Sequence, residues 1–183
     1  MFEVFYNQTI RKMTVAFGSM FNNVYATRLN SDGSTAAHVR VPLGYGPKDK
    51  WIRRLREQNP LDDDSNETSI TLPRLSFEMT SLTYDPDRKK NTIQKRFLKS
   101  SQNEKIMRNY VEVPYDIEFS VSAMVKFMED GLSIMEQILP YFTPEFTVNV
   151  NTIPDMNIKA DIPILLNSSS VADEYEGDLS TRR

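Results

Sequence analysis

The pattern of apolar and polar side chains is most informative between residues 115 and 146. From residue 115 to residue 123 apolar side chains alternate with polar ones, which predicts a strand with one buried face. From Met124 to Leu139 the spacing changes to three and four residues, which predicts a helix that Pro140 ends. The apolar stripe expected to face the core consists of Met124, Phe127, Met128, Leu132, Met135, Ile138 and Leu139.

The first 60 residues are predicted to form two helices and a hairpin. Aromatic and apolar side chains repeat at helical spacing over Glu3–Phe21, and such a face is typical of a core or a subunit interface. Apolar positions on both sides of the turn-forming sequence Asn30–Gly33 predict a β-hairpin. A second helix is expected over Gly46–Gln58, with a basic side that surrounds Trp51, the only tryptophan.

A long strand and a basic segment occupy the middle of the chain. The strand is predicted between Leu72 and Pro86, and residues 87–107 follow with no sustained periodicity. Because the alternation resumes at Val111, we interpret 87–107 as an excursion between two paired strands. Further strands are expected near 146–150 and 158–166. The elements predict an α+β fold in a single domain over 1–183, a mainly antiparallel twisted sheet with helices packed on one face and extended loops.

Composition narrows the class of protein. The 183 residues are 26% charged and 39% hydrophobic, values of a soluble globular protein. No apolar run approaches the roughly 20 residues of a membrane span, and no signal peptide is recognisable. We therefore expect a protein made and used in the cytosol, or in a particle assembled there. A net charge of -3 argues against a generally basic nucleic-acid binder, and the lack of cysteine excludes disulfides and thiolate chemistry.

The candidate chemical motifs do not assemble into an active site. His38, the only histidine, lies in a predicted strand without a Glu or Cys at ligand spacing. Asp62–Asp64 lacks the alternating oxygen ligands of a calcium loop, so a solvated loop is the better interpretation. Gly44–Gly46 is a glycine pair without the lysine of a phosphate loop. The sequence therefore predicts no catalytic residue, no metal site and no cofactor.

The basic segment is the strongest charge feature. Residues 86–108 have eight cations against two carboxylates and a net charge of +6, although the whole chain is at -3. A molecule polarised in this way attracts an acidic surface on one side. The alternative interpretation is a solvated loop. The cations are Arg88, Lys89, Lys90, Lys95, Arg96, Lys99, Lys105 and Arg108.

Five ordered segments span nearly the whole chain and indicate a family. They are MFEVFYNQTIRKMTVAFGSMFNNV, VRVPLGYGPKDKWIRRL, LPRLSFEMTSLTYDPDRKKN, EQILPYFTPEFTVNVN and EGDLSTRR. Together they resemble the tail sheath stabilisation and completion protein of T-even-type contractile-tailed phages. In that family, further strand sequence normally follows a dibasic end like Arg182-Arg183, so we expect either a truncated chain or the loss of one strand.

The resemblance implies a tail-terminator-like fold and a structural role in the virion. A homohexameric ring would cap the tail tube and the last sheath ring at the neck-proximal end of the tail and offer an attachment surface to neck proteins. The expected partners are therefore further copies of the chain, the tube protein, the sheath protein and neck proteins, with assembly in the host cytoplasm. No catalysis and no membrane association are implied.

We expect such a protein to function through its contacts with other protein subunits. The basic segment is predicted to reach a neighbouring subunit or the tube and sheath, and the corner around Pro140 to set the geometry between sheet and neighbour. An acidic stretch over Asp173–Asp178 is a second interface candidate. The candidate interface residues are Arg88, Lys89, Lys90, Lys95, Arg96, Phe97, Lys99, Tyr141, Phe142, Trp51, Asp173 and Glu174.

Two other functions stay open at this point. The basic segment could line the lumen of a ring and contact DNA through phosphates, although Phe97 is its only aromatic residue and single-strand binders usually have several. A metal-dependent enzyme with a carboxylate pair such as Asp63 and Glu67 is the remote alternative.

Overall fold

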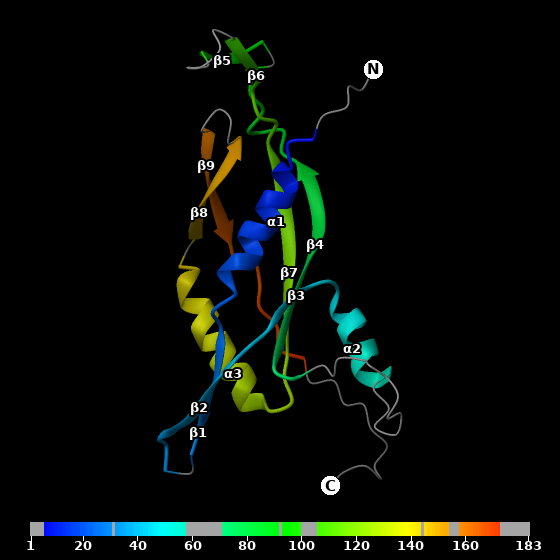
Figure 1. The fold of residues 1–183 in the computed structure, drawn as a ribbon, viewed down its shortest axis with the longest axis vertical. Helices are drawn as coiled ribbons and strands as arrows, with labels where there is room; N and C mark the ends of the chain where they lie inside the picture. Colours follow the sequence, from blue (N-terminus) through cyan, green and yellow to red (C-terminus); the bar gives the residue numbers. More distant parts are fainter. Residues whose placement is uncertain are drawn as a thin grey trace.

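The protein is long and narrow in the computed structural model (Figure 1). The structure describes residues 6–30, 32–57, 71–91, 93–99, 106–143, 145–153 and 158–172. Their elements are α1 (Thr9–Met20), β1 (Tyr25–Leu29), β2 (Thr35–Arg40), β3 (Leu43–Tyr45), α2 (Lys48–Glu57), β4 (Arg74–Tyr84), β5 (Lys95–Lys99), β6 (Ile106–Tyr110), β7 (Tyr115–Met124), α3 (Met128–Ile138), the 3-10 helix η1 (Leu139–Tyr141), β8 (Glu145–Ile153) and β9 (Ile158–Leu165). No helix in these ranges has the length and apolar character required to cross a membrane.

The predicted α+β class and the mainly antiparallel pairing are confirmed. Among the described residues, the strands are divided among four small sheets instead of one, namely β1-β2, β3-β4-β7, β5-β6 and β8-β9. Each of these pairings is antiparallel except that of β3 with β4. Strands that pair in twos leave open edges, so much of the backbone of this protein lies at the border of a sheet.

The longest pairing joins β4 and β7. Their register runs from Arg74 opposite Met124 to Tyr84 opposite Tyr115, with an irregularity between Met79 and Ser81. Both strands were predicted from the alternation of their side chains. The structure corrects one detail: β7 begins at Tyr115, and residues 111–114 before it are not in a strand.

Helix α1 packs between the β4-β7 pair and the β8-β9 hairpin. The ring of Phe17 stacks on Phe119 of β7 at 4.2 Å between centroids and lies 5.8 Å from Phe77 of β4. On its other side the Lys12 ammonium donates to the carbonyl of Thr152 in β8. The predicted start at Glu3 is wrong, because Tyr6–Gln8 are not helical and Gln8 has a left-handed φ of 56° immediately before Thr9.

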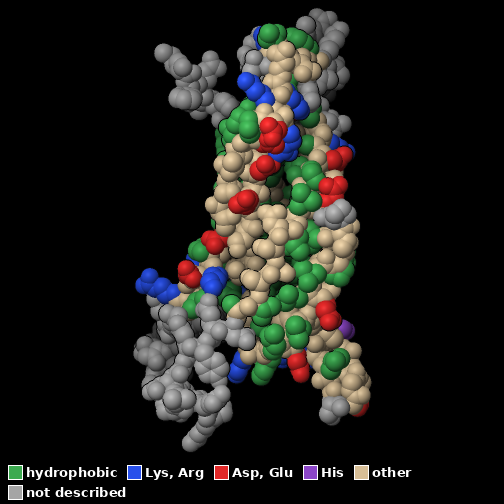
Figure 2. Space-filling model, turned by 180° about the vertical axis from the view of Figure 1, so that it is seen from behind, with side chains coloured by type: hydrophobic (Ala, Val, Ile, Leu, Met, Phe, Trp, Pro, Cys, Tyr) green, Lys and Arg blue, Asp and Glu red, His purple; other side chains and the backbone are tan. Residues whose placement is uncertain are grey.

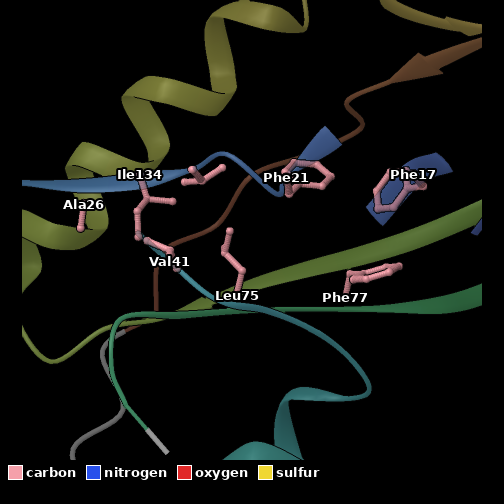
Figure 3. Close-up of a cluster of buried hydrophobic side chains, with 8 residues drawn as sticks. Phe17, Phe21, Ala26, Val41, Leu75, Phe77 and Ile134 are labelled. Atoms are coloured by element: carbon pink, nitrogen blue, oxygen red, sulfur yellow. The ribbon is translucent and has the colours of Figure 1, made fainter. Parts of the chain in front are cut away.

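Figure 3 shows the core of the described residues, a cluster of buried apolar side chains. It joins the C-terminal half of α1, the start of β4, the β1-β2 hairpin and α3. Close packing also constrains Gly18 next to the cluster, since a Cβ on this residue would lie 2.6 Å from Cζ of Phe77. The buried apolar side chains of the cluster are Phe17, Phe21, Val24, Ala26, Val41, Leu75, Phe77 and Ile134.

Helix α3 buries the predicted face only in part, since Ile138 of the predicted stripe packs against the core but other members of the stripe do not. Met128 and Leu132, both assigned to the apolar stripe, are about half exposed, whereas Ile134 is 1% exposed and Asp130 3%. Met124 is the last residue of β7, and the helix begins only at Met128. Counting a helical period from inside the strand therefore shifted the phase of the predicted stripe.

Strand β3, parallel to β4, was not predicted as separate from the hairpin, and the remaining elements agree with the sequence pattern with one exception. The β1-β2 hairpin turns through Gly33 at φ 81°, a conformation that glycine adopts without a steric penalty. Helix α2 and the β8-β9 hairpin also lie where they were predicted. The exception is the basic segment, where the absence of periodicity predicted no strand and the structure has the hairpin β5-β6.

Candidate interface surfaces

The base of the basic segment is held by ion pairs to the stalk, the β4-β7 pair from which the segment projects. Arg88 donates to Asp85 at the end of β4 and to Asp116 near the start of β7. The hydrogen bond from Arg88 lowers the pKa of Asp85, and the same bond together with that to Asp116 raises the pKa of Arg88. Nζ of Lys90 lies 3.5 Å from Oε2 of Glu112. Arg88 and Lys90 are therefore partly neutralised within the chain.

The far end of the segment is the β5-β6 hairpin, which forms one tip of the molecule (Figure 1). Phe97 in β5 is 63% exposed, and Ile93 just before the strand is 81% exposed. Lys89 and Lys95 are also exposed. Arg96 and Lys99 lie in β5, but their side chains are outside the described part of the structure. This tip combines exposed apolar side chains with basic ones, a mixture found at protein interfaces.

Figure 2 shows basic and acidic side chains next to one another below that tip, on the face opposite to Figure 1. This mixture agrees with the ion pairs at the stalk. A partner that bound this surface would therefore meet a patterned surface and not a uniform positive patch.

Trp51 is buried instead of standing at the surface. Its ring is 7% exposed, and the guanidinium of Arg74 lies 4.0 Å from the ring centroid. Lys50 and Arg54 approach the same ring at 5.7 Å and 5.5 Å. These contacts are cation–π interactions, which favour cations above an aromatic face. Of the three cations around Trp51, Lys50 and Arg54 are exposed, and an interface role for the ring itself stays a prediction.

The corner after α3 contains one exposed and one packed aromatic residue. Tyr141 is 68% exposed and meets Phe146 edge to face at 6.4 Å between centroids. Phe142 packs against the core cluster and also lies 6.4 Å from Phe146. Near Tyr141 in sequence, Phe127, Met128 and Leu132 are all about half exposed. The two candidate residues of this corner are thus structurally different, and only Tyr141 is available to another molecule.

Other candidates are surface groups or lie outside the described residues. Nδ1 of the exposed His38 is 3.1 Å from the Thr27 hydroxyl, across the β1-β2 hairpin. Asp173 and Glu174 are outside the described residues, as are Asp63 and Glu67. Within the described ranges, no three His, Asp or Glu side chains are grouped closely enough to hold a metal ion.

The sequence did not predict the row of hydrogen bonds that joins side chains of α3 to β1. Gln137 accepts from the backbone N–H of Tyr25 at 3.1 Å and donates to its carbonyl at 2.5 Å. The hydroxyl of Ser133 accepts from the N–H of Thr27 at 3.1 Å. The buried Asp130 accepts two hydrogen bonds from Arg28, at 3.3 Å and 3.1 Å. The spacing of three and four residues between these α3 side chains was the available signal, because it places them on one helix face.

Comparison with known proteins gives two matches. A family model for the tail sheath stabiliser of T4-like viruses of the Myoviridae matches residues 4–183. The chain is also 27% identical over 190 residues to the tail completion protein gp15 of Enterobacteria phage T4, in an alignment that covers 100% of this chain and 68% of that protein. Both matches confirm the resemblance that the five sequence segments indicated.

Proposed function

Because the chain belongs to the tail sheath stabiliser family of T4-like viruses, we propose that it forms a ring that caps the tail tube and the last ring of the sheath. At the coarser level, it is a structural component of a contractile phage tail. The family match over residues 4–183 is the observation that supports the proposal. We further propose that the ring is a homohexamer at the neck-proximal end of the tail and that it offers the attachment surface for the neck.

The architecture is suited to work through interfaces. Four small sheets leave open strand edges, and the β5-β6 hairpin projects at one tip of a narrow body (Figure 1). Projecting elements let a subunit form large contacts without enlarging its own core. Large exposed side chains such as Phe97 and Tyr141 supply apolar area of the kind that anchors protein contacts.

The basic tip is the part that we propose contacts a neighbouring subunit, the tube or the sheath. Arg88 and Lys90 pair with stalk carboxylates. We assign the contact to three other basic residues of the segment, Lys89, which is exposed, and Lys95 and Arg96, which lie in β5. A complementary acidic surface on the partner would guide the encounter and fix the orientation.

The test uses tails assembled without this protein and completed by adding the purified chain. The variant Lys89→Glu/Lys95→Glu/Arg96→Glu is compared with Arg11→Glu/Lys126→Glu/Lys159→Glu, which makes the same change in net charge at exposed positions elsewhere. Electron microscopy counts tails that keep a full-length sheath and join heads. We expect the tip variant to lower that count at least tenfold and the control to match the unmodified chain.

Two results would contradict parts of the proposal. If the tip variant completes tails normally, the basic tip does not make the proposed contact. If both variants fail equally, the change in net charge and not its position causes the loss. The ring itself is tested on the unmodified chain, by light scattering and by the symmetry of the particle at the end of completed tails. A chain that stays monomeric and leaves tails incomplete would refute it.

A further inference from the structure

The two edges of the β1-β2 hairpin differ in whether their backbone groups are hydrogen-bonded to other elements. The β1 edge is closed, because Gln137 and Ser133 of α3 occupy the backbone groups of Tyr25 and Thr27. The β2 edge has no strand beside it in the described part of the chain. Helix α3 thus blocks strand addition on one side only.

The hydrogen bonds of β1 reveal which backbone groups of β2 point outward. Tyr25 and Thr27 direct their backbone groups away from β2, toward α3. In an antiparallel pair, residues opposite such positions also point away from their partner strand. Tyr25 is opposite Arg40 and Thr27 is opposite His38. The N–H from Val41 to the carbonyl of Val24 at 2.9 Å fits the same alternation.

The backbone groups of His38 and Arg40 therefore form an open edge. Within the described residues, no hydrogen bond reaches the N–H or C=O of either residue from outside the hairpin. Residues Thr35–His38 are all exposed, with no proline or lysine among them to discourage pairing. An unguarded edge of this kind accepts an added strand.

A groove on one face of the hairpin reaches this edge at His38 and would give such a strand a side-chain site. The shallow groove, about 400 Å³ in volume, is lined by His38 of β2, by Tyr25 and Thr27 of β1, and by Gln137 of α3. Backbone pairing at an edge supplies affinity, and an adjacent groove that takes one side chain supplies selectivity. The occupant is thus expected to be an extended strand with one bulky apolar side chain.

The β5 strand of a second copy has these properties. It contains Phe97, 63% exposed, and it begins with the basic pair Lys95-Arg96. Helix α3, which contributes Gln137 to the groove, has Glu136 next to that residue and Glu129 in its first turn, both exposed, and no cation between Met128 and Ile138. β5 and β2 lie at opposite ends of the molecule (Figure 1), so their pairing would be a contact between two different surfaces. Contacts of that type, repeated with rotation, close into rings.

We propose that the open edge of β2 binds β5 of a second copy of the chain, with Phe97 in the groove. The inference rests on the proposed function, because it supplies the contact through which the subunits of the ring would join. It predicts that the outward amides of His38 and Arg40 become protected from hydrogen exchange on assembly.

Proline substitution gives a direct test. His38→Pro removes an outward N–H that β1 does not use, whereas His38→Ala removes only the imidazole and its contact with Thr27. Sedimentation is expected to show self-association at least tenfold weaker for His38→Pro than for His38→Ala. Equal association of the two variants would overturn the inference.

Cross-linking tests the partner without relying on how the proline variant folds. The chain has no cysteine, so in a mixture of His38→Cys and Phe97→Cys subunits one copy of the chain can link to another only through these sites. In completed tails we expect a covalent dimer from this mixture and none when Phe97→Cys is replaced by Thr147→Cys, an exposed position on β8. Absence of the first dimer would overturn the inference. The proposed function would still stand if the unmodified chain completes tails and forms a ring.

Discussion

The contact between Gly18 and Phe77 leads to a quantitative prediction. A Cβ at residue 18 would lie 2.6 Å from Cζ and 3.0 Å from Cε1 of Phe77, closer than carbon atoms can pack. Phe77 has little room to move, because it is 7% exposed and has Phe17, Tyr45 and Phe119 around it. Overpacking of this kind costs about 1–3 kcal/mol. Because Phe77 has little room to move, the cost is expected at about 2–3 kcal/mol, and the better helix propensity of alanine returns up to about 1 kcal/mol, so Gly18→Ala should lose roughly 1–2 kcal/mol.

Urea unfolding of Gly18→Ala, Phe77→Leu and the double variant measures this loss. In a chain of this size 1 kcal/mol corresponds to about 2–4 °C in Tm. If the clash is the cause, the shorter side chain in the double variant relieves it, and the two losses combine to less than their sum by at least about 1 kcal/mol. Gly131→Ala is the matched control, because its new Cβ would meet only Cγ2 of Val125 at 3.3 Å and the change should be close to neutral. A Gly18→Ala protein as stable as Gly131→Ala would refute the argument.

Two further predictions concern the stalk and the corner after α3. The Arg88 hydrogen bond holds the pKa of Asp85 below its ordinary value of 3.8, so this group stabilises the fold above pH 3.8 and the contribution is lost as the pH falls through its lowered pKa. We therefore expect Asp85→Asn to be less stable than the unmodified chain in urea at neutral pH and equally stable well below pH 3.8; a difference that persists in acid would contradict this. At the corner, Phe142→Ala should lower the Tm by several degrees, whereas Tyr141→Ala should keep the Tm and weaken ring formation, because only Phe142 packs on the core. Normal ring formation by Tyr141→Ala, seen by light scattering, would remove Tyr141 from the interface.

Elements with a sustained period could be predicted from the sequence, and elements without one could not. The β4-β7 pair and the β1-β2 hairpin follow from alternation and from a turn that suits glycine at residue 33. The β5-β6 hairpin could not be predicted, because apolar and polar residues do not alternate along KRFLK and IMRNY. For α3, the helix was foreseen but its buried face was not, since the true face includes the charged residue Asp130.

The sequence showed where the candidate interface residues are concentrated, but not which of them contact other residues of the same chain. Charge counting located the basic segment, but the pairing of Arg88 and Lys90 with the stalk depends on two strands that meet only in the folded chain. In the same way, Trp51 looked like a surface anchor among cations, whereas Arg74, 23 positions further along the chain, helps to cover its ring. Contacts between residues distant in sequence decide both cases.

The aromatic contact of α1 has a mechanical consequence for the projecting tip. A load applied to the β5-β6 hairpin pulls on β4 and β7 together and in the same direction, so it does not peel one strand from the other. Both strands pack against the same residue of α1, because Phe77 of β4 and Phe119 of β7 each contact Phe17. Tension at the tip is therefore divided between the backbones of β4 and β7, and both strands transmit it to the buried side chain of Phe17.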